Sequence, residues 1–480
     1  MSSQNPNNHH DDDEDDREPA MLDPMEADEV IDVDGDVPMD DEDDDGIEEA
    51  IALQNDSSAH FDAHNDSIFC ISQHPTDPSI VATGGGDDLA YIFDSTPEPS
   101  PVLPSSYQSN PQPVERKSLD IVARLEGHTD SVNALTFTLP RGEYLVTAGL
   151  DGQVLVWKDT EGSKLVWKNV ANAKEVEEIN WVESCPSPAH PNSIALGASD
   201  GSVWVYEIGE SQDAPLSPVQ AYYLHSGPCT AGAWTSDGNL LSTISEDGSF
   251  YVWDPWGEAA AAGTTAPNGG QALVTLTPED ERFKVEGGLY SIAISPGGTL
   301  AAVGGAQGMI RVVGLPKLAK GKGGSQASGS QAGQILASLQ AQTDSVETLS
   351  FSDPPTTLLA AGSVDGSIVL FDVAHRYALR RRIEAAHEEE AVIKVEFVHG
   401  SGARVTNSWI LTSAGNDGIV RRWDCRGGTA AAAKGLIQEL KGHRGGGEEG
   451  GVLGFVQSSD TGRIVTAGDD SVSLVFNAPL

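Results

Sequence analysis

The chain has 480 residues and a formal net charge of −45, from 73 acidic and 28 basic side chains. A surface this acidic repels phosphate, which excludes direct binding to nucleic acid or anionic membranes and favours a cationic partner. No charged and apolar leader opens the chain, and no apolar run is long enough to cross a bilayer. We therefore expect an intracellular protein of the cytoplasm, with the nucleus open as a second location.

The first part of the chain predicts a disordered acidic tail. Residues 1–56 contain 23 acidic side chains against Arg17 alone, a net charge of −22. The acidic runs at 11–16 and 40–45 repel themselves, and large apolar residues are too sparse to build a core. We predict a tail over residues 1–56 and a folded domain over residues 57–480, which is itself acidic with a net charge of −23.

The folded part consists of a repeated strand pattern. From about residue 57, short runs of alternating apolar residues are separated by Gly, Asp, Asn and Ser, which is typical of strands joined by tight turns. One phrase, an apolar strand that usually ends in an aromatic residue, occurs eight times. The eight endings are Ala90–Asp94, Leu155–Lys158, Trp204–Glu207, Tyr251–Asp254, Arg311–Gly314, Val369–Asp372, Arg421–Asp424 and Leu474–Asn477.

Turn residues support the same division. Asp-Gly precedes five of the endings, as in Asp151-Gly152, and glycine accepts the positive φ that a tight hairpin turn requires. The endings are about 55 residues apart, longer than the ~40–45 residues of a common propeller repeat, because of insertions that we expect to be loops. These insertions are residues 95–118, 257–270, 315–333 and 427–435.

This pattern resembles the WD40 repeat. Leu125–Val132, with its Gly-His pair, followed by Trp157, is close to the full repeat, and Leu440–His443 repeats its opening. The resemblance covers residues 57–480 and implies an all-β, eight-bladed WD40-type β-propeller. Val313-Gly314 is a degenerate ending and most repeats lack the Gly-His pair, so seven blades, with one poor repeat serving as a loop, is the alternative.

Ring closure favours eight blades. Each WD40 repeat begins with the outer strand of the preceding blade, and the sequence stops just after the third strand of the last one. Residues 57–62 stand where an outer strand should precede His64. We predict that this N-terminal strand completes the eighth blade, which leaves only short edges exposed.

No catalytic or metal-binding constellation emerges. His128, Thr147, Asp151 and Trp157 have the family's spacing for a buried hydrogen-bonded set within a blade, so a structural role is favoured over a hydrolase. The cysteines stand singly, without a Cys-x-x-Cys pair, which predicts reduced core thiols. They are Cys70, Cys185, Cys229 and Cys425. We expect no enzyme activity, no cofactor and no metal.

The family pattern predicts an acidic partner-binding face. In WD40 propellers, the loops before the innermost strands and the residue before the Asp of the Asp-Gly turn lie on one side, around a central channel. Transferred to this sequence, that rule collects Asp66, Glu175, Glu177, Glu246, Glu286, Glu347, Glu388, Glu389, Glu390, Glu448, Glu449 and Asp469. Phe69 and Tyr290 are the candidate apolar anchors on the same face, and Lys394 is the nearby exception.

An acidic tail, eight blades and an acidic face together resemble the angio-associated migratory cell protein group. Its fungal members are dedicated chaperones of a large-subunit ribosomal protein of the L ten family. The resemblance implies capture of the client's basic N-terminal segment and support for assembly of the 60S subunit. The sequence gives no oligomeric signal, so we expect a monomer.

Two other binding functions stay open. Trp423–Arg426 matches the short WDxR pattern of substrate receptors of ubiquitin ligases, and an acidic tail also suits a histone chaperone. The basic cluster Arg380–Arg382 is expected on an outer edge strand, where charge prevents aggregation between sheet edges.

Overall fold

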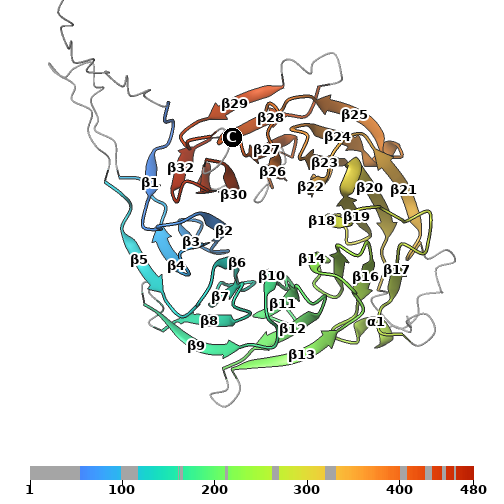
Figure 1. Ribbon diagram of the computed structural model, residues 1–480, viewed down its shortest axis with the longest axis horizontal. Coiled ribbons are helices and arrows are strands. Elements are labelled where there is room, and N and C mark those ends of the chain that lie inside the picture. The colour runs from blue at the N-terminus through green and yellow to red at the C-terminus, as the bar shows by residue number, and fades with distance from the viewer. Residues whose placement is uncertain are drawn as a thin grey trace, which may run out of the picture. The chain divides into compact units, whose positions relative to one another are not determined.

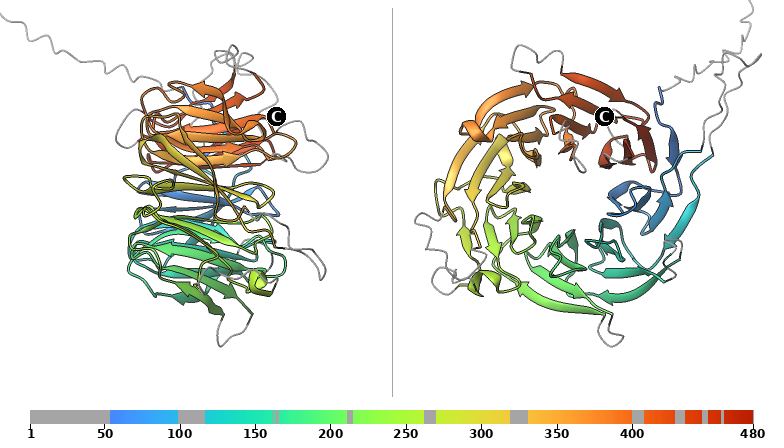
Figure 2. Two further views of the ribbon diagram at one scale, coloured as in Figure 1. Left: turned by 90° about the vertical axis from the view of Figure 1, so that its right-hand side faces the viewer. Right: turned by 180° about the vertical axis from the view of Figure 1, so that it is seen from behind.

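The computed structural model describes residues 54–98, 117–160, 162, 166–210, 215–261, 270–318, 331–399, 408–427, 435–445, 450–458 and 461–479. Within these ranges the chain forms eight four-stranded antiparallel sheets that stand in a ring (Figure 1). Seen edge-on, the ring is a disc whose two faces carry the connections between strands (Figure 2). The all-β, eight-bladed prediction is confirmed. Residues 1–53 of the predicted tail lie outside the described ranges.

Each sheet, or blade, has an innermost strand near the ring centre and a second strand beside it. The innermost strands are β2 Ile68–Gln73, β6 Val132–Phe137, β10 Ile179–Ser184, β14 Cys229–Trp234, β18 Leu289–Ile294, β22 Val346–Phe351, β26 Val392–Phe397 and β30 Val452–Ser458. The second strands are β3 Ile80–Gly85, β7 Tyr144–Gly149, β11 Ser193–Ala198, β15 Leu241–Ser245, β19 Leu300–Gly305, β23 Leu358–Ser363, β27 Ile410–Gly415 and β31 Arg463–Gly468.

The third and outer strands complete the blades. The third strands are β4 Ala90–Asp94, β8 Val154–Asp159, β12 Val203–Ile208, β16 Phe250–Trp253, β20 Met309–Gly314, β24 Ile368–Asp372, β28 Val420–Asp424 and β32 Ser473–Asn477. The outer strands are β5 Ile121–Leu125, β9 Trp167–Ala173, β13 Leu216–Tyr222, β17 Val274–Leu276, β21 Ile335–Gln340, β25 Ala378–Ile383, β29 Leu436–Leu440 and, in the eighth blade, β1 Ala59–Phe61.

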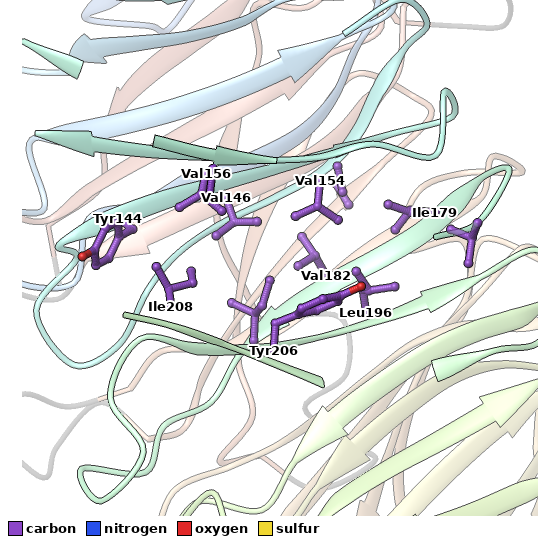
Figure 3. Packing of buried hydrophobic residues seen from close by; sticks show 14 of the residues in the cluster. Tyr144, Val146, Val154, Val156, Ile179, Val182, Leu196, Tyr206 and Ile208 are labelled. Carbon is purple, nitrogen blue, oxygen red and sulfur yellow. The ribbon is translucent and has the colours of Figure 1, made fainter. Parts of the chain in front are cut away.

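The sequence of a strand reflects its depth in the ring. Second strands such as β7 are buried along their whole length because neighbouring blades cover both faces, and they are apolar or small throughout. Outer strands are less covered: in β5 only the last residue, Leu125, is buried, and the others are exposed or half-buried. The core therefore lies between blades, as between blades 2 and 3, where Val146 and Val156 face Val182, Leu196 and their neighbours (Figure 3).

The first strand of the described chain closes the ring. β1 pairs with β32, with Ala59 opposite Val475 and Phe61 opposite Ser473. Phe61 is fully buried and stacks on Phe93 of blade 1, with ring centroids 4.2 Å apart. The predicted closure of the eighth blade by an N-terminal strand is thus confirmed.

Blade 5 and one insertion depart from the expected pattern. Blade 5 is a complete four-stranded sheet despite its degenerate ending, and Gln307, at a φ of 58°, takes the place of the Asp-Gly turn. The insertion at 257–270, expected to be a loop, contains the short helix α1, Glu258–Ala261. The other helical segments described are the 3-10 turns η3, Ala306–Gly308, and η4, Val373–His375. No helix in the described ranges is long and apolar enough to cross a membrane.

Candidate functional site

Strand direction gathers two sets of connections at one end of the blades. Because every blade is antiparallel, the connection into its innermost strand and the turn between its second and third strands lie at the same end. We call this end, taken over all eight blades, the upper face. The connections between first and second strands, and between third and outer strands, form the lower face.

Buried hydrogen bonds hold the upper connections against the blades. In blade 2, His128 Nε2 lies 2.9 Å from Thr147 Oγ1, which also accepts a bond of 3.1 Å from the Trp157 indole N–H. His128 Nδ1 is 3.1 Å from an Asp151 carboxylate oxygen. All four side chains are buried. The groups therefore satisfy one another inside the blade, where a substrate has no access.

Four more blades contain the same arrangement. A loop histidine meets a Thr or Ser hydroxyl of the second strand in each, at separations of 18 to 26 residues along the chain. The pairs are His64–Thr83, His225–Thr243, His387–Ser413 and His443–Thr466. The Gly-His motif identifies only His128 and His443. The other three could have been found from the His-to-hydroxyl spacing.

Nine of the ten predicted acids that the structure describes lie in connections of the upper face. Asp66, Glu175, Glu177, Glu286, Glu388, Glu389 and Glu390 are in connections that lead into innermost strands, and Glu246 and Asp469 are in turns between second and third strands. Glu347 differs, because it is the second residue of β22 itself. Glu448 and Glu449 lie outside the described residues.

Three blades bring predicted residues close together. Tyr290, second in β18, is half-buried; its burial, followed by the negative charges of Glu246 and Glu347, raises the pKa of its phenol. Burial and then Asp344 raise the pKa of Glu347. Blades 4, 5 and 6 thus build one negative region around an aromatic ring. The Tyr290 hydroxyl donates a 2.5 Å hydrogen bond to the Gly287 carbonyl.

Other predicted acids have partners of their own. Asp469 of blade 8 accepts a 2.6 Å hydrogen bond from the Ser67 hydroxyl, next to Asp66 of blade 1. Glu286 forms an ion pair with Lys284 at 3.1 Å, which offsets part of its charge. The remaining acids of the set share the face without a direct contact to one another in the described structure.

Sequence reasoning missed acids between blades 1 and 2. Asp88, in the turn between β3 and β4, lies near Asp130 in the loop before β6. Slight burial and then repulsion from Asp130 and Asp87 raise the pKa of Asp88. The signal was available, since Asp88 lies in the same turn, two residues after the position that the rule inspects, and Asp130 lies in a loop that the rule includes.

The channel has its own charges. Every innermost strand has a bulge between its first and third residues, so equal positions correspond around the ring. The second and fifth residues of these strands are exposed or half-buried, except for Ser350, which is buried. Phe69 and Tyr290 occupy second positions, and Phe69 is 41% exposed.

Glu183 and Glu396 occupy fifth positions in opposite blades, 3 and 7. Lys394 pairs with Glu396 at 3.0 Å and donates to the Phe455 carbonyl at 2.8 Å. Burial alone would raise the pKa of Glu396, but Lys394 and a bond from Gln457 lower it. The Glu183 side chain is exposed to water, but the surrounding protein removes part of its hydration and raises its pKa to about 7. The positive charge of Lys394 lowers this pKa, but by less than the loss of hydration raises it.

The remaining candidates are accounted for locally. No group of three His, Cys, Asp or Glu side chains in the described chain could hold a metal, and the four cysteines are free thiols. Cys70 is half-buried and the other three are buried. Arg426 of the WDxR match forms a two-pronged ion pair with Asp424.

The basic cluster lies on the outer strand β25, as predicted, but its middle residue is not an edge charge. Arg381 is only 1% exposed and donates to the Asp424 carbonyl at 2.9 Å, because the alternation of the strand turns it inward.

Comparison with known proteins agrees with this architecture. Residues 55–94, 119–158, 216–254 and 333–372 match the family model of the WD domain, G-beta repeat. Each match runs from the outer strand of one blade to the third strand of the next.

Three known proteins are similar to this chain over most of its length. The ribosome assembly protein SQT1 of Saccharomyces cerevisiae is 29% identical over 475 residues, covering 94% of this chain and 93% of that protein. The angio-associated migratory cell protein of Homo sapiens is 24% identical over 435 residues, covering 90% and 82%. The crystal structure of Chaetomium thermophilum Sqt1 bound to the N-terminus of the ribosomal protein L10 is 50% identical, with a TM-score of 0.77, and covers 88% of this chain and all of that one.

Proposed function

This chain belongs to the Sqt1 family of WD40-repeat proteins, and on that premise we propose that it is a dedicated chaperone of the ribosomal protein L10. It binds the basic N-terminal segment of the newly made client and supports assembly of the 60S subunit. The observation that carries the proposal is the 50% identity, over nearly nine-tenths of this chain, to a propeller crystallised with that segment.

The acidic upper face supplies the physical reason. One exposed ion pair contributes only about 0.2–1 kcal/mol, so no single carboxylate determines binding. Acids from many blades around a partly dehydrated channel mouth concentrate the field and attract a cationic segment. Tyr290 and Phe69 add apolar area at the same mouth, which anchors the segment once it has arrived.

The proposed action is binding without chemistry. The histidines that resemble catalytic groups instead form hydrogen bonds that hold loops against the blades, as His128 does with Thr147 and Asp151. A newly made ribosomal protein is strongly cationic and binds RNA indiscriminately, so covering its charged segment prevents misplaced contacts. We propose that the protein binds its client in the cytoplasm, where the client is made, and later delivers it to a pre-ribosomal particle.

A charge-reversal experiment tests the proposal. Glu246→Lys, Glu347→Lys and Asp469→Lys together should abolish binding of a labelled peptide of the L10 N-terminus, measured by fluorescence anisotropy, because they reverse three charges at the channel mouth. The control reverses three exposed acids at or near the lower face, Glu143, Glu207 and Glu210, and should bind like the wild type. Unchanged affinity in the upper-face variant, with both proteins folded by circular dichroism, would disprove the proposed site.

A further inference from the structure

A groove on the upper face between blades 2 and 3 combines acids with aromatic rings. Its rim is formed by the β9–β10 connection, which contributes Glu175 and Glu177, and by the β11–β12 turn, which contributes Asp200. Glu175 and Val176 of the groove also line a second, narrow hollow, the throat, together with Trp204, Tyr206 and residues of the core. Figure 3 shows that core, in which Tyr206 lies beside Leu196 and Val182.

Aromatic rings extend from the throat towards solvent. Trp204 and Tyr206 are nearly parallel, 15° apart, with centroids separated by 6.1 Å. Tyr223, in the loop after β13, meets Trp204 edge-on at 6.0 Å. The exposed fraction of Tyr223 is 63% and that of its neighbour Leu224 is 42%. An aromatic ring this exposed in a loop beside another ring offers a free π face to a ligand.

In the part of the chain that the structure describes, no basic side chain forms an ion pair with the carboxylates of the rim. Among the described residues, Glu175 and Glu177 form no ion pair, and Asp200 accepts only the backbone N–H of Ser202. Lys174 is the single basic residue of the lining, against three acids. Burial, followed by the charges of the Glu175 carboxylate and the Tyr223 phenol group, raises the pKa of Tyr206, so these groups act on the same small space.

We propose that this groove binds one Arg or Lys side chain of the client segment, with its charged head between Glu175, Glu177 and Asp200 and its stem against Tyr223 and Trp204. The inference rests on the proposed function and makes it more specific. Carboxylates alone would accept a cation anywhere on the upper face. Adding aromatic surface selects for a cation with a long apolar stem at one defined place.

The geometry favours a cationic occupant over a purely apolar one. An apolar side chain in the groove would strip water from unpaired carboxylates without replacing their hydrogen bonds, which is unfavourable. A guanidinium or ammonium group replaces that hydration with charge-assisted hydrogen bonds. The groove therefore fixes the register of a basic segment that the rest of the acidic face attracts without choosing a position.

The test measures coupling between groove and peptide. Tyr223→Ala and Glu177→Gln should each weaken binding of a labelled L10 N-terminal peptide by about threefold to fivefold. A peptide series replaces each Arg and Lys in turn by norleucine. At one position the replacement should weaken binding to the wild type but not to Tyr223→Ala, since the shared contact is already lost.

Matched controls separate the groove from the face as a whole. Leu379→Ala, an exposed apolar residue of β25, and Glu207→Gln should leave affinity unchanged. If both groove variants bind like the wild type, or if no peptide position is coupled to Tyr223, the groove inference is wrong while the chaperone function stands. If the wild type itself does not bind the peptide, the proposed function fails instead.

Discussion

At the scale of single residues, buried histidines connect the upper loops to the blades. Five blades use a His bonded to a Thr or Ser of the second strand. Blade 6 uses Gln342, whose amide donates to the Ser367 carbonyl at 2.9 Å. In blade 5, Arg311 has the same role, because its guanidinium donates hydrogen bonds to the Arg282 and Lys284 carbonyls. Different side chains thus satisfy the polar groups beneath a loop in different blades.

His225 predicts a loss of stability in mild acid. Burial lowers its pKa to about 4, from an ordinary value of 6.5. Between these values the unfolded chain binds a proton that the folded chain rejects, so the free energy of unfolding falls as pH falls through this window. From pH 7 to pH 5 this one group should remove about 2 kcal/mol, measurable by urea unfolding at each pH.

A glutamine variant isolates that contribution. His225→Gln copies the solution of blade 6, keeps a donor amide and cannot titrate. Its stability should fall less than that of the wild type between pH 7 and pH 5, by about the same 2 kcal/mol. Parallel pH profiles for the two proteins would show that His225 is not held neutral by burial.

At the scale of elements, the ring depends on a three-residue strand. β1 joins the first described residues to the last blade, and Asp56 before it exchanges hydrogen bonds with the backbone of Lys441. The strand is short, so its side chains rather than its ladder supply most of the closure energy. Phe61 is fully buried between Phe93, Tyr91 and His64.

Phe61→Ala should therefore open the ring. Truncating a fully buried phenylalanine leaves a cavity that neighbouring atoms do not fill, and this lowers the free energy of unfolding by about 3–5 kcal/mol. Asp62→Ala, at the exposed neighbouring position, is the control and should change stability by less than about 0.5 kcal/mol. Urea unfolding followed by tryptophan fluorescence measures both, and a loss below 1 kcal/mol in Phe61→Ala would mean that the seal lies elsewhere.

At the scale of the whole molecule, the net negative charge attracts a basic client before the two proteins touch. The folded residues and the first 56 residues each carry about half of the net charge of −45. We propose that the N-terminal segment widens the region from which a basic client is attracted, and that the upper face then holds it. Electrostatic attraction of this kind changes association rates more than dissociation rates.

Removing residues 1–50 should accordingly slow association with the L10 N-terminal peptide more than it weakens the equilibrium affinity. Stopped-flow fluorescence at about 50 mM salt measures the rate. At about 500 mM salt the difference between the two proteins should vanish, since screening then acts within a few ångströms. An unchanged association rate at low salt would remove this role from the segment.

The repeats alone determined much of this protein. Alternating strands, Asp-Gly turns and the WD40 phrase around His128 and Trp157 predicted the strand order and favoured eight repeats over seven, because these features are local and recur. Ring closure by an N-terminal strand over residues 57–62 was also predicted, and the pairing of β1 with β32 confirms it.

Only the tertiary structure decided which side chains meet. Arg381 belongs to a charged run but turns inward, and Glu183 looks like any strand residue, yet its carboxyl is influenced by the charge of Lys394 from the opposite blade. Asp88 and Asp130, or Trp204 and Tyr223, come from separate segments that pack together only when the ring forms. Such pairings depend on blade curvature and loop path, which result from packing between blades and leave no periodic signal in the chain.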